Sequence, residues 1–395
     1  MDGLDFARSP LIVFWESTRA CMLVCKHCRA NAITEPLPGE LSTEEALNLV
    51  DQIASMGPPR PILIVTGGDP LMRRDIWDIV EYAVSRGLRV AMAPSVTPLL
   101  NRDSIRRMAR VGVSRISISI DSARPEVHDA IRGVPGTFKA SVKAVKTAID
   151  EGLKVQVNTV VMRPTVEDLP LMVKLLVDLG VDVWEVFYVI PVGRAARSLD
   201  LSPGEWEDVS NFLYDASRYG VLVRTVEGPM FRRVALTRMA LERLGRGFEV
   251  LPSRLRPGSL YRRLVDSLER IMGPPRGPPR PHTTGTRDGW GVIFVSYNGD
   301  VYPSGFLPLK MGNVRETPLA DIYRRGRYAE QLRRAVFKGR CGVCEFKVIC
   351  GGSRARAYSY TGDPLAEDPA CQYIPGELGE LSPSILRLAA SKRFL

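Results

Sequence analysis

A regular alternation of short apolar runs and amphipathic segments fills the first half of the chain and constrains its fold more than any other feature. The apolar runs have the length and composition of buried β-strands and lie at residues 11–15, 62–66, 88–93, 115–120, 154–161 and 183–190. In one amphipathic segment between them, Ser42 and Glu45 have the spacing of a helix capping box. Because strands that alternate with helices pair in parallel through right-handed crossovers, the pattern predicts an α/β fold.

Glycines between the predicted helices and strands support this prediction. Four helices end shortly before the next strand, at Gly87, Gly112, Gly152 and Gly180. Glycine has no Cβ and adopts the left-handed conformation of a helix end at little cost. We predict a partial (β/α)6 barrel of parallel strands, which the pattern alone does not separate from a doubly wound sheet. In either architecture the functional groups lie at the carboxyl ends of the strands.

The regular pattern stops after Pro191. Residues 201–271 are arginine-rich and typical of helices, and residues 272–289 form a connector rich in proline and glycine. Beyond it, Asn298 and Gly299 separate two strand-like runs, which predicts a β-hairpin. We therefore divide the chain into a barrel, a helical bridging region, a small C-terminal domain with a hairpin and a C-terminal tail, at residues 1–200, 201–289, 290–375 and 376–395.

Composition limits where the protein works and what it binds. No apolar run approaches the roughly 20 residues of a membrane span, and the start of the chain lacks the basic and apolar regions of a secretion signal. We expect a cytoplasmic protein whose thiols stay reduced. The net charge of +10 fits a nucleic-acid partner, but the arginines are spread along the chain without a stacked-aromatic RNA motif, so nucleic acid is not the favoured partner.

Three cysteines, Cys21, Cys25 and Cys28, lie within eight residues directly after the first predicted strand. Structural zinc sites usually take thiols as two close pairs. Three thiolates in one loop with no obvious fourth ligand instead suit an iron-sulfur cluster that leaves one iron open.

This spacing, with the aromatic His27 before the last cysteine, resembles the signature of the radical SAM superfamily. The resemblance implies a 4Fe-4S cluster on the three cysteines, with S-adenosylmethionine bound to the fourth iron. The segment "VTGGDP" (65–70) is similar to the family's glycine-rich motif, which implies that Gly67, Gly68 and Asp69 bind this cofactor. Asp69 stands where glutamate is commoner.

Further matches lie at the ends of later strands. "SISIDS" with "VHDAIRGVPGTF" is similar to the family's fourth-strand segment, and two polar residues occupy comparable positions elsewhere. The resemblance implies further cofactor contacts from Ser95, Ser119, Asp121, Arg132 and Asn158. Ordinary capping and turn hydrogen bonds are the alternative for each of them. His128 we interpret as local structure rather than a base.

The C-terminal cysteines are Cys341, Cys344, Cys350 and Cys371. Four thiolates can hold either zinc or a fully ligated cluster. Their spacing resembles the SPASM and twitch extensions of radical SAM enzymes, which implies one auxiliary 4Fe-4S cluster. The match is partial, because Ser304 and Arg354 stand where a full SPASM domain has further cysteines.

The resemblance implies an enzyme that reductively cleaves S-adenosylmethionine and removes hydrogen from a substrate, with a reduced ferredoxin or flavodoxin-type protein as electron donor. The tail is similar to that of proteins that process haem precursors, and also to maturases of ribosomal peptides or cofactor precursors. The arginine-rich middle region favours a carboxylate-rich substrate such as a tetrapyrrole, because guanidinium matches carboxylate geometry. A non-enzymatic, zinc-dependent nucleic-acid-binding protein is the alternative from another class, against which the cysteine triplet and the glycine motif argue.

Overall fold

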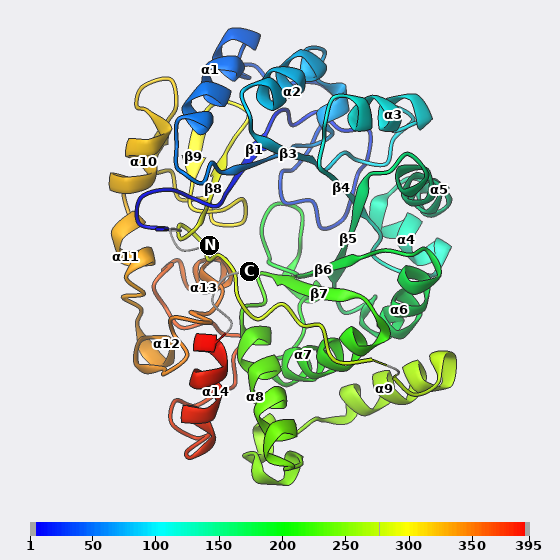
Figure 1. Cartoon of the computed structure of the whole chain (residues 1–395), viewed down its shortest axis with the longest axis vertical. Helices are drawn as coiled ribbons and strands as arrows, with labels where there is room; N and C mark the ends of the chain where they lie inside the picture. The colour runs from blue at the N-terminus through cyan, green and yellow to red at the C-terminus, as the bar shows by residue number, and fades with distance from the viewer. Residues whose placement is uncertain (1–4, 276, 392–395) are drawn as a thin grey trace.

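The computed structural model describes residues 5–275 and 277–391, and the first four residues of the predicted barrel region and the last four of the predicted tail lie outside the described residues (Figure 1). The described strands form one ten-stranded sheet in the order β10-β9-β8-β1-β2-β3-β4-β5-β6-β7. They are β1 (Ile12–Glu16), β2 (Ile62–Thr66), β3 (Arg89–Met92), β4 (Arg115–Ser119), β5 (Lys154–Val161), β6 (Val183–Tyr188), β7 (Leu222–Val226), β8 (Val292–Val295), β9 (Asp300–Tyr302) and β10 (Gly312–Asn313).

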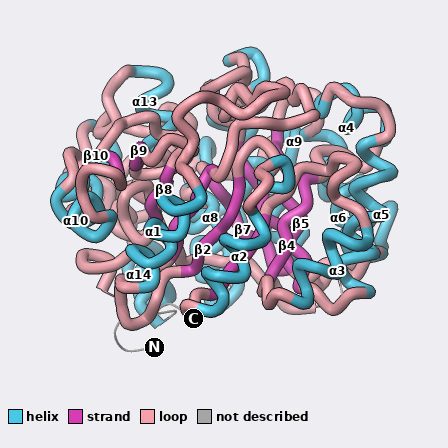
Figure 2. The backbone as a smooth tube through the Cα atoms, turned by 90° about the horizontal axis from the view of Figure 1, so that it is seen from above, coloured by secondary structure: helices cyan, strands magenta, loops and turns pink. Residues whose placement is uncertain are grey.

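Helices cover the outside of this curved sheet (Figures 1 and 2). The barrel helices are α1 (Thr43–Ala54), α2 (Ile76–Ser85), α3 (Arg102–Arg110), α4 (Pro125–Arg132), α5 (Thr137–Asp150), α6 (Leu169–Asp178), α7 (Pro203–Ala216), α8 (Met230–Leu244) and α9 (Ser259–Met272). The C-terminal helices are α10 (Leu319–Arg325), α11 (Ala329–Arg333), α12 (Gly339–Val343), α13 (Arg354–Thr361) and α14 (Leu381–Ser391). None of the helices within the described ranges has both the length and the apolar composition of a membrane crossing.

The strand order decides between the two architectures that the sequence left open. Strands β1 to β7 pair in parallel with their neighbours in sequence, one after another. A doubly wound sheet would instead reverse its order at a switch point. The structure therefore confirms the partial barrel. It also confirms the capping box at Ser42 and Glu45 and the left-handed backbone of the four helix-ending glycines.

Two strands depart from the sequence-based expectation. Residues 201–271, predicted as helices, include β7, which pairs in parallel with β6. The predicted hairpin forms between β8 and β9, but β8 also pairs in parallel with β1 and so extends the barrel sheet. Arg224 interrupts the apolar pattern of β7, and no local pattern could indicate that β8 lies beside β1. Eight parallel strands result within the described chain.

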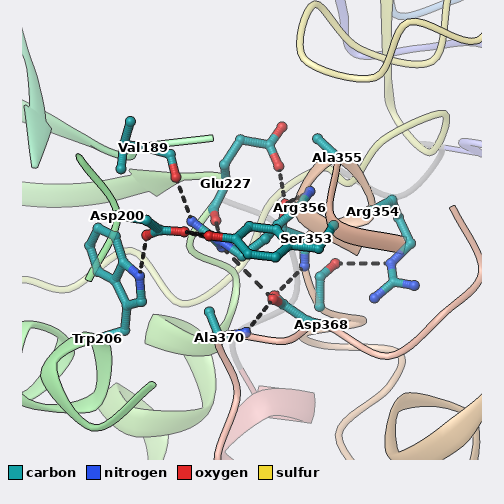
Figure 3. Close-up of polar contacts among 12 residues, drawn as sticks. Val189, Asp200, Trp206, Glu227, Ser353, Arg354, Ala355, Arg356, Asp368 and Ala370 are labelled. Carbon is teal, nitrogen blue, oxygen red and sulfur yellow. Dashed lines mark hydrogen bonds and ion pairs between the residues drawn. The ribbon is translucent and has the colours of Figure 1, made fainter. Parts of the chain in front are cut away.

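A buried arginine joins the C-terminal part of the chain to the open end of the barrel (Figure 3). Arg356 on α13 is 1% exposed and donates hydrogen bonds to the backbone carbonyls of Val189 and Glu227, at 2.9 and 3.0 Å. These residues follow the carboxyl ends of β6 and β7. The carboxylates of Asp200 and Asp368 lie 3.7 and 3.9 Å from its guanidinium nitrogens. Arg356 thus fixes α13 over the carboxyl ends of these two strands.

Helix α14, the last of the described helices, packs against α8. Leu381, Ile385 and Leu388 of α14 belong to a buried cluster with Leu236 and Leu241 of α8. Figure 1 shows α14 alongside α8. The described part of the predicted tail is therefore an integral part of the fold.

Candidate active site

The three N-terminal cysteines lie on a loop that follows β1 at the carboxyl end of the sheet. The loop is closed by the Cys21 N–H, which donates to the Ile33 carbonyl at 2.7 Å, and by the Ile33 N–H, which donates to the Arg19 carbonyl at 3.1 Å. Cys21 and Cys25 are buried and Cys28 is half-buried. Burial raises the pKa of the Cys21 and Cys25 thiols, so both sulfurs need a metal or a cationic partner to be held as thiolates.

The two glycines of the "GGDP" segment allow the cysteine loop to lie directly against β2. A Cβ on Gly68 would lie 2.3 Å from the Ala20 carbonyl oxygen, and one on Gly67 would lie 2.5 Å from that of Thr18. Instead, the Gly68 N–H donates to the Thr18 carbonyl at 2.8 Å. Side chains at these positions would therefore displace the cysteine loop itself.

Asp69 and Ser95 link the loops after β2 and β3. The Asp69 carboxylate is fully buried and accepts hydrogen bonds from the Leu71 and Ser95 N–H groups and from the Thr97 hydroxyl, at 3.1, 3.3 and 2.8 Å. The Ser95 hydroxyl donates to the Gly68 carbonyl at 2.7 Å and lies 3.4 Å from the Cys21 sulfur. Asp69 therefore fixes the backbone around the cysteine loop.

A cavity of about 180 Å³ brings most of the sequence-predicted residues together. All three cysteines line it. Its wall also contains the predicted cofactor contacts Gly67, Gly68, Ser95, Ser119, Arg132 and Asn158. Asp69 and Asp121, also predicted as cofactor contacts, lie behind this wall rather than in it.

Asp121 holds Arg132 in the cavity wall. Its carboxylate is fully buried, accepts a hydrogen bond from the Val160 N–H at 3.0 Å, and forms an ion pair with Arg132 at 2.8 Å. Burial is the largest single influence and acts to raise the pKa of Asp121, but the Arg132 charge, the two neighbouring histidines and the Val160 hydrogen bond together outweigh it, so the pKa is lowered and the carboxylate is ionised. The Arg132 guanidinium in turn lies 3.8 Å from the Cys25 sulfur. A guanidinium beside a sulfur stabilises thiolate, the form that binds iron.

Two histidines flank this ion pair. Burial lowers the pKa of His27 and of His128 to about 4, so both are neutral near pH 7. The 3.8 Å approach of His27 to Asp121 is therefore not an ion pair at that pH. His128 Nδ1 accepts a hydrogen bond from the Asp121 N–H at 3.1 Å, which agrees with the local structural role predicted for it.

Arg194, which the sequence did not single out, also lines the cavity. Its backbone N–H donates to the Cys28 carbonyl at 3.0 Å. Its guanidinium donates to the carbonyls of Cys25 and Ala32, at 2.9 and 3.0 Å. The preceding Gly193 has a positive φ of 61°, and a Cβ there would lie 2.3 Å from the Cys28 carbonyl oxygen. The only sequence signal was a Gly-Arg pair just beyond the end of the sixth predicted strand.

The four C-terminal cysteines line a second cavity. Burial raises the pKa of Cys344, Cys350 and Cys371 to about 12. The Asp368 N–H and the Arg354 guanidinium approach the Cys341 sulfur at 3.4 and 3.6 Å. Such donors suit a metal-bound thiolate, which accepts hydrogen bonds.

Both thiol sets fit iron-sulfur clusters. Within residues 5–275 and 277–391, no three His, Cys, Asp or Glu side chains converge closely enough to hold a single metal ion. The thiols at each site line a cavity, which leaves room for a cluster of several irons. At the second site, a Cβ on Gly352 would lie 3.0 Å from the Cys341 sulfur, so the glycine preserves that space.

A partial parallel barrel with three thiols in the loop after its first strand, and a second thiol set beside its open end, defines a class of cluster-dependent enzymes. The family models for the Radical SAM superfamily and for the SPASM iron-sulfur cluster-binding domain match residues 15–176 and 287–345. The chain belongs to the radical SAM superfamily and carries a SPASM domain. It is therefore an enzyme that uses 4Fe-4S clusters and S-adenosylmethionine, which excludes the non-enzymatic zinc protein considered above.

Curated relatives are similar over almost the whole chain. The AdoMet-dependent heme synthase of Nitratidesulfovibrio vulgaris is 38% identical over 92% of this chain and 92% of its own. The AdoMet-dependent heme synthase of Methanosarcina barkeri is 34% identical over 95% of this chain and 99% of its own. The mycofactocin maturase MftC of Mycobacterium tuberculosis is 28% identical over 93% and 84%.

Solved structures share the fold at low identity. Streptococcus suis SuiB bound to S-adenosylmethionine has a TM-score of 0.68 and 15% identity, covering 93% of this chain and 78% of that chain. Native anSMEcpe with bound AdoMet has a TM-score of 0.66 and 15% identity, and the match covers 97% of this chain and 99% of that chain. The common fold extends through the barrel and the C-terminal region.

Proposed function

We propose that Cys21, Cys25 and Cys28 ligate the 4Fe-4S cluster that binds S-adenosylmethionine. The cavity carries this proposal, because the three thiols line it together with Gly67, Gly68, Ser95, Ser119, Arg132 and Asn158. We assign these six residues to contacts with S-adenosylmethionine. Asp69 and Asp121 are positioning residues. Asp69 holds the backbone at Ser95, and Asp121 holds the Arg132 side chain.

When bound, the cluster and S-adenosylmethionine supply a 5′-deoxyadenosyl radical that removes a hydrogen atom from the substrate. The chain's own residues hold the reacting groups in place and restrict water. Arg194 and the Gly67–Gly68 backbone fix the cysteine loop, and Arg132 places positive charge beside Cys25. No side-chain acid or base is assigned to the reaction.

For the second site, we propose that Cys341, Cys344, Cys350 and Cys371 fully ligate one auxiliary 4Fe-4S cluster. Four protein ligands leave no open iron, which favours electron transfer or a structural role over direct contact with substrate. The buried Arg233 lowers the pKa of Cys371, although burial raises it more. This cation balances part of the negative charge of a four-thiolate cluster.

We propose that the substrate is a carboxylate-rich haem precursor and that the reaction is oxidative decarboxylation of a propionate. The support is the similarity to AdoMet-dependent heme synthases at 38% and 34% identity over most of both chains. In net terms, a propionate becomes a vinyl group by losing carbon dioxide, one hydrogen atom, which would end in 5′-deoxyadenosine, and one electron, which would pass to a one-electron acceptor such as the auxiliary cluster. A four-propionate iron porphyrin becomes haem when two of its propionates react in this way.

Maturation of a ribosomal peptide is the second candidate. Its support is the mycofactocin maturase, which is 28% identical over 93% of this chain. The larger identity to the heme synthases favours the tetrapyrrole substrate.

The test is anaerobic turnover. The reconstituted protein, S-adenosylmethionine, dithionite and a four-propionate iron porphyrin should yield 5′-deoxyadenosine together with divinyl product, detected by chromatography and mass. Cys25→Ala should abolish both products. Formation of 5′-deoxyadenosine with an unchanged porphyrin would overturn the substrate assignment, and wild-type activity in Cys25→Ala would overturn the cluster assignment.

A cytoplasmic location and a reduced ferredoxin or flavodoxin-type donor complete the proposal. Seven free cysteines suit a reducing compartment. The net charge of +10 favours an acidic protein as donor.

A further inference from the structure

A row of polar side chains crosses the inside of the barrel from the cofactor cavity to its last strand. Ser119 on β4 pairs in register with Asn158 on β5, Asn158 with Glu185 on β6, and Glu185 with Arg224 on β7. In-register residues of parallel strands face the same side of a sheet. Ser119 and Asn158 line the cavity with the cysteines, so Glu185 and Arg224 continue the same inner face.

Arg115 joins this row from the amino end of β4. It lies four residues before Ser119 and therefore on the same face of its strand. Burial lowers the pKa of Arg115, the charge of Arg224 lowers it further, and the carboxylates of Asp182 and Glu185 act to raise it, so these three groups lie near the Arg115 guanidinium.

The side chains of these two half-buried arginines make no hydrogen bond within the described residues, and the Arg224 side chain is 35% exposed. Arg115 Nη1 and Arg224 Nε are buried without a hydrogen-bond partner, and Arg224 reaches Glu185 only at 4.0 Å. By contrast, the buried Arg232 nearby donates to the carbonyls of Thr286 and Ile349 at 2.7 and 3.0 Å. A buried N–H donor without a partner is costly, and an anion placed between the two guanidinium groups would give Arg115 Nη1 and Arg224 Nε an acceptor.

We propose that Arg115 and Arg224 form an anion subsite that receives a carboxylate of the substrate, with Glu185 holding Arg224 toward it. This inference rests on the proposed function for the identity of the substrate. Guanidinium groups bind carboxylates through paired N–H donors, and the two arginines together offer such donors on the inner face of the barrel.

The position of the subsite indicates the size of the ligand. Arg224 lies two strands from Asn158, which corresponds to roughly 10 Å across the sheet. A molecule that fills the subsite while a second group lies beside the cofactor must span that distance. A porphyrin with propionates at opposite edges meets this requirement, whereas a single amino acid does not.

The experiment tests whether binding depends on the carboxylates of the ligand and on the charges of the two arginines. Binding of the four-propionate iron porphyrin and of its tetramethyl ester is titrated by absorbance against the reconstituted wild type, Arg115→Gln, Arg224→Gln and Arg224→Lys. Each Gln variant should weaken binding of the acid about tenfold or more, with partial recovery in Arg224→Lys, and should leave binding of the ester unchanged. Arg334→Gln is the matched control, because Arg334 is 72% exposed on the surface. Iron content and unfolding temperature report whether each variant folds.

The outcomes separate the subsite from the proposed function. Equal acid binding by the wild type and both Gln variants would overturn the subsite and leave the function standing. If the wild type binds neither porphyrin, the proposed substrate is wrong, and adipate then serves as the probe. Adipate should raise the unfolding temperature of the wild type more than that of the Arg115→Gln/Arg224→Gln double variant. An equal rise in both proteins would overturn the subsite as well.

Discussion

Single residues of the cysteine loop show what a sequence can and cannot predict about this site. The three cysteines and the glycine pair were predicted correctly to lie together, because their spacing is specific and strand ends meet at one edge of the sheet. Arg194 was missed because its partners are backbone carbonyls of Cys25, Cys28 and Ala32, which leave no mark on the sequence. Side-chain direction was equally hidden, so the sequence could not indicate that the Asp69 carboxylate faces the loop after β3.

Gly68 should be irreplaceable even by alanine. The added Cβ would lie 2.3 Å from a backbone oxygen, which no side-chain rotation can relieve. We expect Gly68→Ala to lose the N-terminal cluster, about half of the bound iron, while the auxiliary cluster stays. Gly204→Ala is the control, since its Cβ would be in ordinary contact at 3.7 Å. Full iron content in Gly68→Ala would contradict this account of the loop.

His128 should make the protein sensitive to mild acid. Its pKa is lowered from 6.5 to about 4, so protonation favours the unfolded chain. The contribution is complete above pH 6.5 and is lost as the pH falls from there toward 4. Between pH 7 and pH 5 the wild type should lose about 2 kcal/mol more unfolding free energy than His128→Asn, in which the amide oxygen can still accept from the Asp121 N–H. Parallel pH dependence in denaturant titrations of the two proteins would show that His128 titrates normally.

At the scale of elements, the sequence predicted the barrel strands that form continuous apolar runs and missed the one that does not. Strands β1 to β6 lie where predicted, because buried parallel strands need apolar residues on both faces. In β7, Arg224 faces the polar inside of an incomplete barrel, so the strand lacks this pattern. The hairpin turn at Asn298 and Gly299 was local and therefore predictable, whereas the place of β8 beside β1 was not.

The attachment of α13 should depend on Arg356. Arg356→Leu leaves the Val189 and Glu227 carbonyls without their donor and removes the cation between Asp200 and Asp368. We expect a loss of about 3–5 kcal/mol in unfolding free energy, as for other broken buried ion pairs. The exposed Arg334→Leu should change it by less than about 0.5 kcal/mol. Similar denaturant midpoints for the two variants would refute the role given to Arg356.

At the scale of the whole molecule, the sheet unites regions that the sequence assigned to separate domains. Strand β8, from the predicted iron-sulfur domain, covers one edge of β1, and Arg29 of the cysteine loop donates to the Gly305 carbonyl of the same C-terminal region at 3.1 Å. The predicted boundary at residue 289 therefore does not separate two independent hydrophobic cores.

A chain ending at residue 289 should not fold to a stable barrel. It would expose the β1 edge that pairs with Val292–Val295 and the face of α8 that packs against α14. An exposed strand edge favours association, so we expect aggregation during purification and a broad or absent unfolding transition by circular dichroism. A monomeric truncated protein with a cooperative transition would restore the two-domain description.

The pairing of β1 with β8 also sets the order of events during synthesis. Ile12 and its partner Val292 lie 280 positions apart in the chain. At translation rates of roughly 5–20 residues per second, the first strand waits on the order of 14–56 s on the ribosome before its second neighbour is made. During that interval the nascent chain presents an unpaired apolar edge next to three free thiols. Heterologous production should therefore respond strongly to chaperone supply and to slower growth, more than to the codons of any single segment.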